Sequence, residues 1–220
     1  MSTSDEKQTE AENQLYDVSD EYAKMAVEAL ASDEVLSHIP VIKTVRGVAK
    51  VVISVRDTIL LRKLQNYLYG FSRVSAEERR EMIARLRSEP DYGDRIGERI
   101  IELLDRVESD RKPSMIAAAF AAFANKEIDL KTLRRLNGAI ERLPTNEIPT
   151  ARQIGDKPYF LNLSSPDQQQ GNIDSESLQA LANAGMILAV PVFDGISFFP
   201  NETAKTFVRL NLDRCQQRDQ

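Results

Sequence analysis

The sequence predicts a mainly α-helical protein, in which a helical bundle is followed by a small α+β domain. Apolar residues recur at three- and four-residue spacing through most of residues 13–143, and capping signals separate the periodic segments. After 144–157, which contain Pro144, Pro149 and Gly155, short apolar runs alternate with turns. We therefore expect a disordered acidic tail at 1–12, a helical domain at 13–143, a linker at 144–157 and an α+β domain at 158–214.

The composition indicates a soluble globular protein in a reducing compartment. The chain has 220 residues, of which 42% are hydrophobic and 29% charged, and a net charge of −5. This charge gives no overall attraction to phosphate backbones or anionic lipids. Cys215 is the single cysteine, so no intrachain disulfide can form. The N-terminus, MSTSDEKQTEAEN, lacks the basic start and apolar run of a secretory signal, so we expect a cytoplasmic protein.

The residue types exclude several classes of active site. His38 is the only histidine, so a site with two or more histidine ligands is excluded, as is a cysteine-rich zinc cluster. No Walker loop and no G-x-G-x-x-G motif occurs. We predict no catalytic, cofactor-binding or metal-binding residue and favour a non-enzymatic protein. Acid–base catalysis by carboxylates alone stays open, but no spacing singles out a pair.

The most apolar long segment is IPVIKTVRGVAKVVISVRD, residues 39–57. On a helix over about 41–69, Lys43, Arg46 and Lys50 form one narrow polar stripe and valines occupy most of the remaining circumference. This pattern favours a core helix. The alternative is a helix on a membrane surface, with the three cations directed towards lipid headgroups.

The next segments predict a series of capped helices. SAEE at 75–78 is a capping box for a helix that ends near residue 88. A further helix follows at about 92–108, and the Ala- and Phe-rich segment at 109–125 is expected to be the most buried helix. Asp129 is the expected N-cap of a helix at 130–143. Exposed arginine-rich faces are predicted to include Arg79, Arg80, Arg134 and Arg135, as candidates for partner contact or as a solvated surface.

The C-terminal part predicts a strand at 158–163, a helix capped by Asp174 and stopped by Gly185, a hairpin around Asp194-Gly195, and a last helix capped by Asn201. The order of helix, glycine, hairpin and helix over 174–212 resembles part of a winged-helix module. Winged helices that bind DNA carry cations on the recognition helix. Residues 171–200 instead contain three acids and no lysine or arginine, so the resemblance implies contact with protein rather than DNA.

Residues 39–143 resemble an uncharacterised family of bacterial helical proteins that is associated with phage defence or abortive infection. The resemblance is carried by IPVIKTVRGVAK, VRDTILLRKLQNYL, RIGERIIELLDRVES and AAFAAFANKEIDLKTLRRL. It implies a bacterial origin and supplies no site residues.

Three functions follow as hypotheses. The first is a non-enzymatic interaction or regulatory protein that binds a protein partner through the C-terminal hairpin or the arginine-rich faces. The second is a peripheral membrane protein that uses the basic helix at 41–55. The third is a nucleic-acid-binding regulator that uses the C-terminal module, which the local charge disfavours. The sequence leaves the oligomeric state open.

Overall fold

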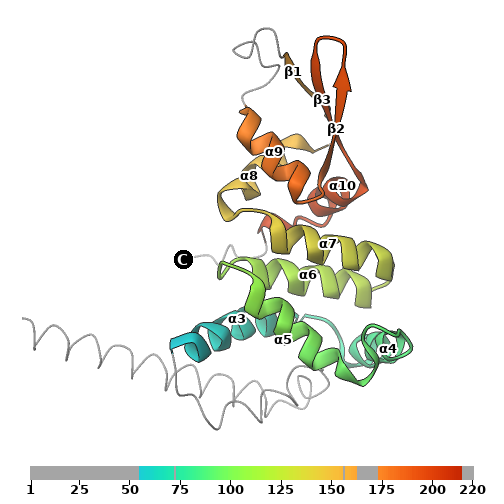
Figure 1. The fold of residues 1–220 in the computed structure, drawn as a ribbon. Coiled ribbons are helices and arrows are strands. Elements are labelled where there is room, and N and C mark those ends of the chain that lie inside the picture. The colour runs from blue at the N-terminus through green and yellow to red at the C-terminus, as the bar shows by residue number, and fades with distance from the viewer. Residues whose placement is uncertain (1–54, 72, 156, 163–172, 215–220) are drawn as a thin grey trace, which may run out of the picture. The chain divides into compact units, whose positions relative to one another are not determined.

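The computed structural model describes residues 55–71, 73–155, 157–162 and 173–214 (Figure 1). Contacts between residues divide the chain into two compact units. Unit 1 comprises Met1–Leu68 and Ser75–Asp105, and unit 2 comprises Tyr69–Val74 and Arg106–Gln220. The described part is mainly helical, with one small antiparallel sheet near the C-terminus, as the sequence predicted.

In unit 1 the helices are α3 (Val55–Phe71, whose last residues belong to unit 2), α4 (Ala76–Arg87), the 3-10 helix η2 (Gly93–Arg95) and α5 (Ile96–Arg106). The predicted capping box of α4 is confirmed. Ser75 Oγ accepts from the Glu78 backbone N–H at 3.3 Å, and the Glu78 carboxylate accepts from the Ser75 N–H at 2.9 Å. The hydrogen bond from the Ser75 hydroxyl lowers the pKa of Glu78.

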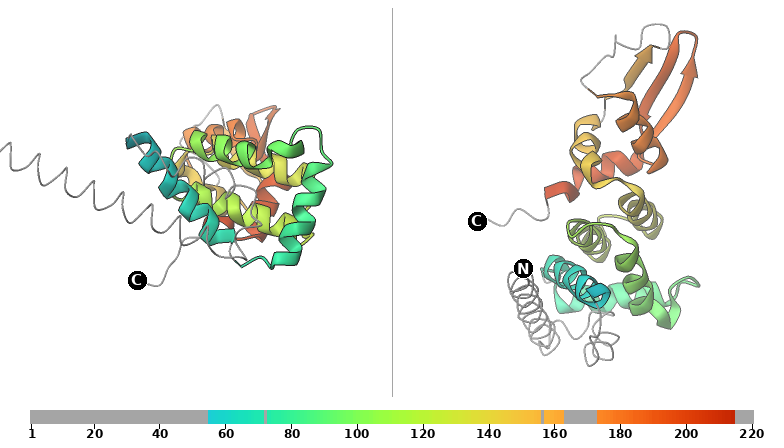
Figure 2. Two further views of the ribbon diagram at one scale, coloured as in Figure 1. Left: turned by 90° about the horizontal axis from the view of Figure 1, so that it is seen from below. Right: turned by 60° about the vertical axis from the view of Figure 1, so that its left-hand side comes forward.

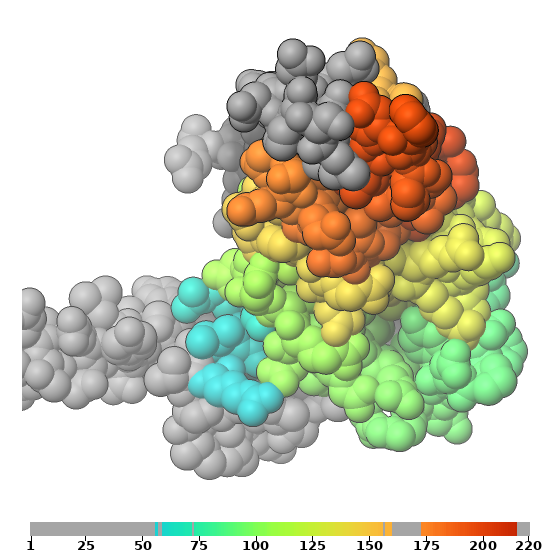
Figure 3. All heavy atoms as spheres, turned by 45° about the horizontal axis from the view of Figure 1, so that its top comes forward, coloured from blue at the N-terminus to red at the C-terminus, as the bar shows by residue number. Residues whose placement is uncertain are grey.

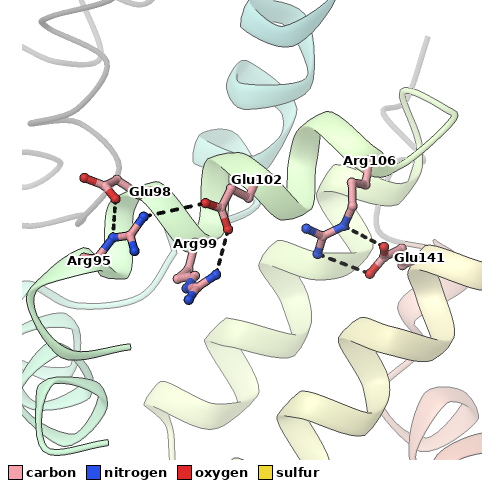
Figure 4. A network of polar contacts seen from close by, with 6 residues as sticks. All are labelled: Arg95, Glu98, Arg99, Glu102, Arg106 and Glu141. Carbon is pink, nitrogen blue, oxygen red and sulfur yellow. Dashed lines mark hydrogen bonds and ion pairs between the residues drawn. The ribbon is translucent and has the colours of Figure 1, made fainter. Parts of the chain in front are cut away.

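Polar contacts connect α3 to α5. The Lys63 ammonium donates to the backbone carbonyl of Asp105 at 3.2 Å, and Arg56 forms an ion pair with the Asp105 carboxylate. Arg56 lies within the apolar arc that the sequence predicted for this helix, and the structure satisfies its charge by this pairing. Exposed ion pairs also run along α5 itself, where Arg95 contacts Glu98 and Arg99 contacts Glu102 (Figure 4).

Unit 2 is built on the helices α6 (Lys112–Ala124) and α7 (Leu130–Arg142). Every residue of α6 except Ala118 and Ala121 is buried, which confirms the prediction that this segment is a core helix. The Asp129 carboxylate accepts from the Thr132 N–H at 2.8 Å and begins α7 as predicted. Arg106 Nε contacts Glu141 Oε1 at 2.7 Å and so connects the first residue of the segment 106–220 to α7 (Figure 4).

The sheet belongs to unit 2 and contains β1 (Tyr159–Asn162), β2 (Ile187–Val192) and β3 (Gly195–Pro200) in the order β1-β3-β2. The helices α8 (Ile148–Ile154), α9 (Ser175–Asn183) and α10 (Glu202–Arg209) lie between the sheet and the pair α6 and α7 (Figures 1 and 2). Buried side chains on the helical side of the sheet include Met186, Phe198 and Phe207.

The structure differs from the predicted linker at 144–157. This segment forms the 3-10 helix η3 (Thr145–Glu147) and then α8, in which Ile148, Ala151 and Ile154 are buried. Pro149 falls in the first turn of α8, where a proline is compatible with a helix. Taking the prolines and Gly155 as signs of a linker was therefore wrong for this segment. The two compact units divide instead after residues 68, 74 and 105.

Further polar contacts fix this segment within unit 2. Glu108 Oε1 accepts from both the backbone N–H and the hydroxyl of Thr145 at 2.9 Å, and from the buried Lys112 ammonium at 3.3 Å. The hydroxyl hydrogen bond lowers the pKa of Glu108. Arg152 of α8 contacts Asp213 Oδ1 at 2.6 Å and thereby holds the C-terminal 3-10 helix η4 (Leu212–Arg214).

Candidate protein-interaction surface

The most unusual surface of the described chain is apolar and lies on the hairpin of β2 and β3. Leu188, Val190 and Val192 of β2, Phe193 of the turn and Phe199 of β3 are all exposed; we call these five residues the hairpin surface. Leu188 is 58% exposed and Phe193 is fully exposed. In the space-filling view of Figure 3, the orange-red atoms of the hairpin lie open at the surface. Contiguous exposed apolar residues on a folded domain often mark an interaction site.

The register of the strands explains why these side chains gather on one face. Side chains alternate between the two faces along a strand, so Leu188, Val190 and Val192 share a face. Leu188 pairs with Phe199, which adds the phenylalanine to the same face. The opposite face begins with the buried Ile187 and Phe198 and carries the contact with the helices. Ile187 and Phe198, at the base of one face, therefore pack in the core, whereas the other face meets solvent, as do Ala189 and Pro191.

Asn201 fixes the base of the hairpin. Its side-chain Nδ2 donates to the Gly185 carbonyl at 2.8 Å, and its backbone N–H donates to the Met186 carbonyl at 3.0 Å. Its Oδ1 accepts from the N–H groups of Thr203 and Ala204 at the start of α10. One residue thus connects the entrance of β2 to the first turn of α10, and so restrains the direction in which the hairpin extends.

The turn from α9 into β2 requires glycine and holds an arginine. Gly185 has φ of +79°, a conformation that other residues rarely adopt. Arg142 of α7 donates to the Ala184 carbonyl at 3.2 Å. A Cβ on either Gly138 or Gly185 would lie 3.3 Å from a guanidinium nitrogen of Arg142, so both glycines leave room for this side chain. The predicted stop at Gly185 is confirmed, and α7 supports it directly.

The helix α9 begins at the predicted cap. The Asp174 carboxylate accepts from the Ser177 N–H at 2.7 Å, and this hydrogen bond lowers the pKa of Asp174. The exposed residues of α9 are Ser175, Glu176, Gln179 and Asn183, and none is basic. Across residues 173–200 the charged residues are Asp174, Glu176 and Asp194. The hairpin surface itself carries no charged side chain.

The predicted hairpin is confirmed, but its turn is displaced by one residue. Phe193 and Asp194 form the two-residue turn, and Gly195 already pairs with Val192 in the sheet. Neither turn residue has a positive φ, so the turn is not the type I′ form that an Asp-Gly pair favours. The shift leaves an aromatic side chain at the tip of the hairpin.

The structure separates the predicted arginine contacts. Arg80 of α4 is exposed and donates to the Ala76 carbonyl at 3.3 Å, while Arg134 and Arg135 are exposed on α7. Arg80 belongs to unit 1, whereas the α7 arginines belong to unit 2. These three remain candidates for partner contact.

The expected exposure of Arg79 is wrong, because this side chain is 0% exposed. Arg79 precedes Met82 by three residues and Leu86 by seven, so helical periodicity puts all three on the buried face of α4. This spacing is visible in the sequence, but the charge of Arg79 outweighed it in the prediction.

Other predicted sites lie outside the described residues. The part of the chain that is not described includes Lys43, Arg46 and Lys50, the acidic tail at 1–12, and the basic segment at 41–55 except its last residue. Their roles stay predictions.

The described residues contain neither a membrane-spanning helix nor a metal-binding cluster. No helix among them combines the length and hydropathy that crossing a bilayer requires. No three histidine, cysteine, aspartate or glutamate side chains within the described ranges are grouped so that they could bind a metal ion.

Sequence reasoning identified the hairpin but not the residues of its exposed face. The signal was present in the register, because Leu188, Val190 and Val192 alternate along one strand. Both faces of ILAVPV are apolar, however, so alternation could not show which face meets solvent. Comparison of the chain with protein-family models, with curated proteins and with solved structures found no match.

Proposed function

We propose that this protein is a non-enzymatic interaction protein that binds a protein partner through the hairpin surface of a winged-helix-like C-terminal module. The observation that carries the proposal is the apolar, uncharged and exposed face formed by Leu188, Val190, Val192 and Phe199, with Phe193 at its tip. Leaving this much apolar surface in water is unfavourable, and a partner that covers it gains the corresponding free energy.

The winged-helix assignment is supported by the order of the elements. The strand β1 precedes α9, the hairpin β2–β3 follows it, and β1 pairs with β3 at the side opposite β2. In this assignment α9 takes the place of the recognition helix and the hairpin is the wing. The support from Asn201 and Arg142 gives the wing a defined direction, which limits the entropy lost on binding.

Charge separates this proposal from a nucleic-acid-binding function. Lysine and arginine contacts with phosphates supply most non-specific affinity for DNA. The described residues of α9 and the hairpin contain no lysine or arginine, and Glu176 is exposed on α9. The same surface would repel a phosphate backbone, whereas an apolar protein surface is indifferent to these charges.

A capture experiment tests the proposal. The full chain is tagged and recovered from its native host in three forms: unchanged, with Val190→Lys, and with Gln179→Lys as a control on the exposed face of α9. We expect a protein partner that is recovered with the unchanged chain and the control but at least tenfold less with Val190→Lys. Binding of the purified partner by the purified chain is then measured directly.

Two results would reject the proposal. One is a set of recovered proteins that does not differ between the unchanged chain and Val190→Lys. The other is salt-dependent binding of duplex DNA that Glu176→Lys strengthens and Val190→Lys leaves unchanged, which would favour the nucleic-acid function. The setting that we propose for the interaction is bacterial phage defence, on the resemblance of residues 39–143 alone.

A further inference from the structure

We propose that the partner of the hairpin surface is a second copy of this chain, packed face to face about a two-fold axis. This proposal rests on the proposed function, because it names the occupant of the same surface. In the arrangement the hairpin surface of one copy covers that of the other, as two sheets cover each other in a β-sandwich. Such an interface is isologous, so each residue meets the same patch on the other copy.

The edge of the sheet is less suited to a partner than its face. β2 is an edge strand, and an edge strand can pair with another chain through its free N–H and C=O groups. Pro191 lies in the middle of β2 opposite Ile196. A proline in an edge strand places its nitrogen on the outer side, where it has no N–H to donate. Pro191 therefore interrupts the row of donors and disfavours extension of the sheet.

The absence of charged side chains from the hairpin surface favours an identical surface as its partner. A two-fold axis brings a central residue close to its own copy, so any charge near the axis would oppose an identical charge. Val190 is central in β2, and its neighbours Leu188, Val192 and Phe199 are also uncharged. A charged partner would find no complementary group on this face, whereas a second copy meets no repulsion there.

The shape of the face is also self-complementary. Val190 pairs with the half-buried Ser197 and Val192 pairs with the buried Gly195, so the valines of β2 lie beside two small residues of β3. The large side chains lie at the two ends, with Leu188 and Phe199 at the base and Phe193 at the tip. When two hairpins pack in opposite directions, the tip of one meets the base of the other, and Val190 lies close to its own copy near the axis.

The size of the surface predicts a reversible dimer. The exposed fractions correspond to roughly 500 Å² of apolar surface, since a phenylalanine side chain buries about 150–250 Å². A stable standard interface buries about 800 Å² on each partner. The hairpin surface therefore supplies most of a small interface, and we expect dissociation in the micromolar range rather than a permanent dimer.

Sedimentation velocity of the purified full chain tests the proposal, over concentrations from roughly 1 to 200 μM, which bracket a micromolar dissociation constant. We expect the unchanged chain to shift from monomer to dimer. Val190→Lys alone and Val190→Glu alone should each stay monomeric, because like charges then meet at the axis. An equimolar mixture of the two variants should recover the dimer, because Lys then faces Glu across the interface.

Two controls distinguish the face from other contacts. Gln179→Lys, on the exposed side of α9, should leave the dimer unchanged. Pro191→Thr restores a backbone donor at the edge of β2 and should leave the dissociation constant within about twofold, whereas edge pairing would become at least tenfold tighter. Thermal unfolding of each variant verifies that it is folded, since all these positions are exposed.

The outcomes separate this proposal from the proposed function. A chain that stays monomeric over the whole range, or a dimer that Val190→Lys does not affect, overturns the second copy as partner. Failure of the mixed charge variants to associate, when each alone is folded and monomeric, also overturns the two-fold arrangement. If the chain is monomeric and a different host protein is captured in a manner that depends on Val190, the proposed function stands while this inference fails.

Discussion

Two apolar segments of similar composition have opposite environments in unit 2. The helix α6, KPSMIAAAFAAFA, is buried around almost its whole circumference, whereas β2, ILAVPV, exposes every residue after Ile187. The helix is central because α7 and other elements of the unit surround it. β2 is the outer strand of a small sheet whose second face has no described helix over it. Apolar composition therefore indicates that a segment is more stable when buried, but the position of the segment in the fold decides whether other parts of the chain bury it.

The largest expected difference between the two segments is in stability. Phe120→Ala in α6 removes a buried ring and should lower the free energy of unfolding by about 3–5 kcal/mol, through lost transfer energy and a cavity. Phe193→Ala at the hairpin tip should change it by less than about 0.5 kcal/mol. Urea unfolding at a protein concentration where the chain is monomeric measures both. Equal losses would mean that the hairpin is packed in solution, and the comparison would fail.

Substitution of Asn201 at the base of the hairpin should lower the free energy of unfolding by an intermediate amount. Asn201→Ala removes the cap of α10 and the bond to the Gly185 carbonyl, and should cost about 1–2 kcal/mol of unfolding free energy. Asn201→Asp keeps the acceptor for Thr203 and Ala204 but loses the donor, so its cost should be smaller. If the two variants are equally unstable, the bond to Gly185 and not the cap holds the hairpin.

The exposed face should respond in association and hardly in stability. Leu188→Gln should change the free energy of unfolding by less than about 0.5 kcal/mol, because the side chain is already largely in water. It should weaken self-association by at least tenfold, because a polar group then enters an apolar contact. Light scattering across a dilution series provides the second measurement. A large loss of stability would place Leu188 in the core and remove the contrast with α6.

The smallest expected effect concerns the support of the hairpin by α9. The pKa of Asp174 is lowered by its bond to the Ser177 N–H, so the charged form is favoured in the folded state. A lowered pKa contributes stability above the unfolded value, near 3.9, and this contribution is lost as the pH falls through the folded value. Asp174→Asn can still cap the helix but should make the urea midpoint less dependent on pH between about pH 5 and pH 2.

A matched variant at the other helix start completes this test. Asp129 of α7 has a lowered pKa for the same reason, through its hydrogen bonds to Thr132. Asp129→Asn should therefore reduce the pH dependence of the midpoint in the same direction. An unchanged pH profile for both variants would show that neither cap carboxylate contributes to acid unfolding.

Local chemistry predicted most of the described helices and the hairpin. Ser75, Asp129, Asp174 and Asn201 each cap a helix in the structure, because a short polar side chain satisfies N–H groups that have no partner within the helix. Gly185 ends α9 because a left-handed φ is needed there. These effects act over three or four residues, so the sequence contains all the information that they require.

Predictions that depended on distant contacts were less accurate. The segment at 144–157 has the prolines and glycine of a linker, yet Ile148, Ala151 and Ile154 are buried within unit 2. Arg152 finds Asp213 at the far end of the chain, and Glu108 finds Thr145. No local sequence pattern predicts an ion pair or hydrogen bond between residues that are tens of positions apart in the chain. The predicted exposure of Arg79 was wrong for a different reason, because its charge suggested exposure while its position on the helix places it on the buried face.

The sequence by itself determined the type and approximate place of most of the described helices and of the hairpin, because capping, periodicity and turn chemistry act between near neighbours in the chain. Only the tertiary structure decided that α6 is enclosed and that one face of β2–β3 is open. Burial depends on which elements come together in space, and both segments satisfy the same apolar pattern. The candidate surface therefore became visible when the register of the hairpin and the exposure of its side chains were known together.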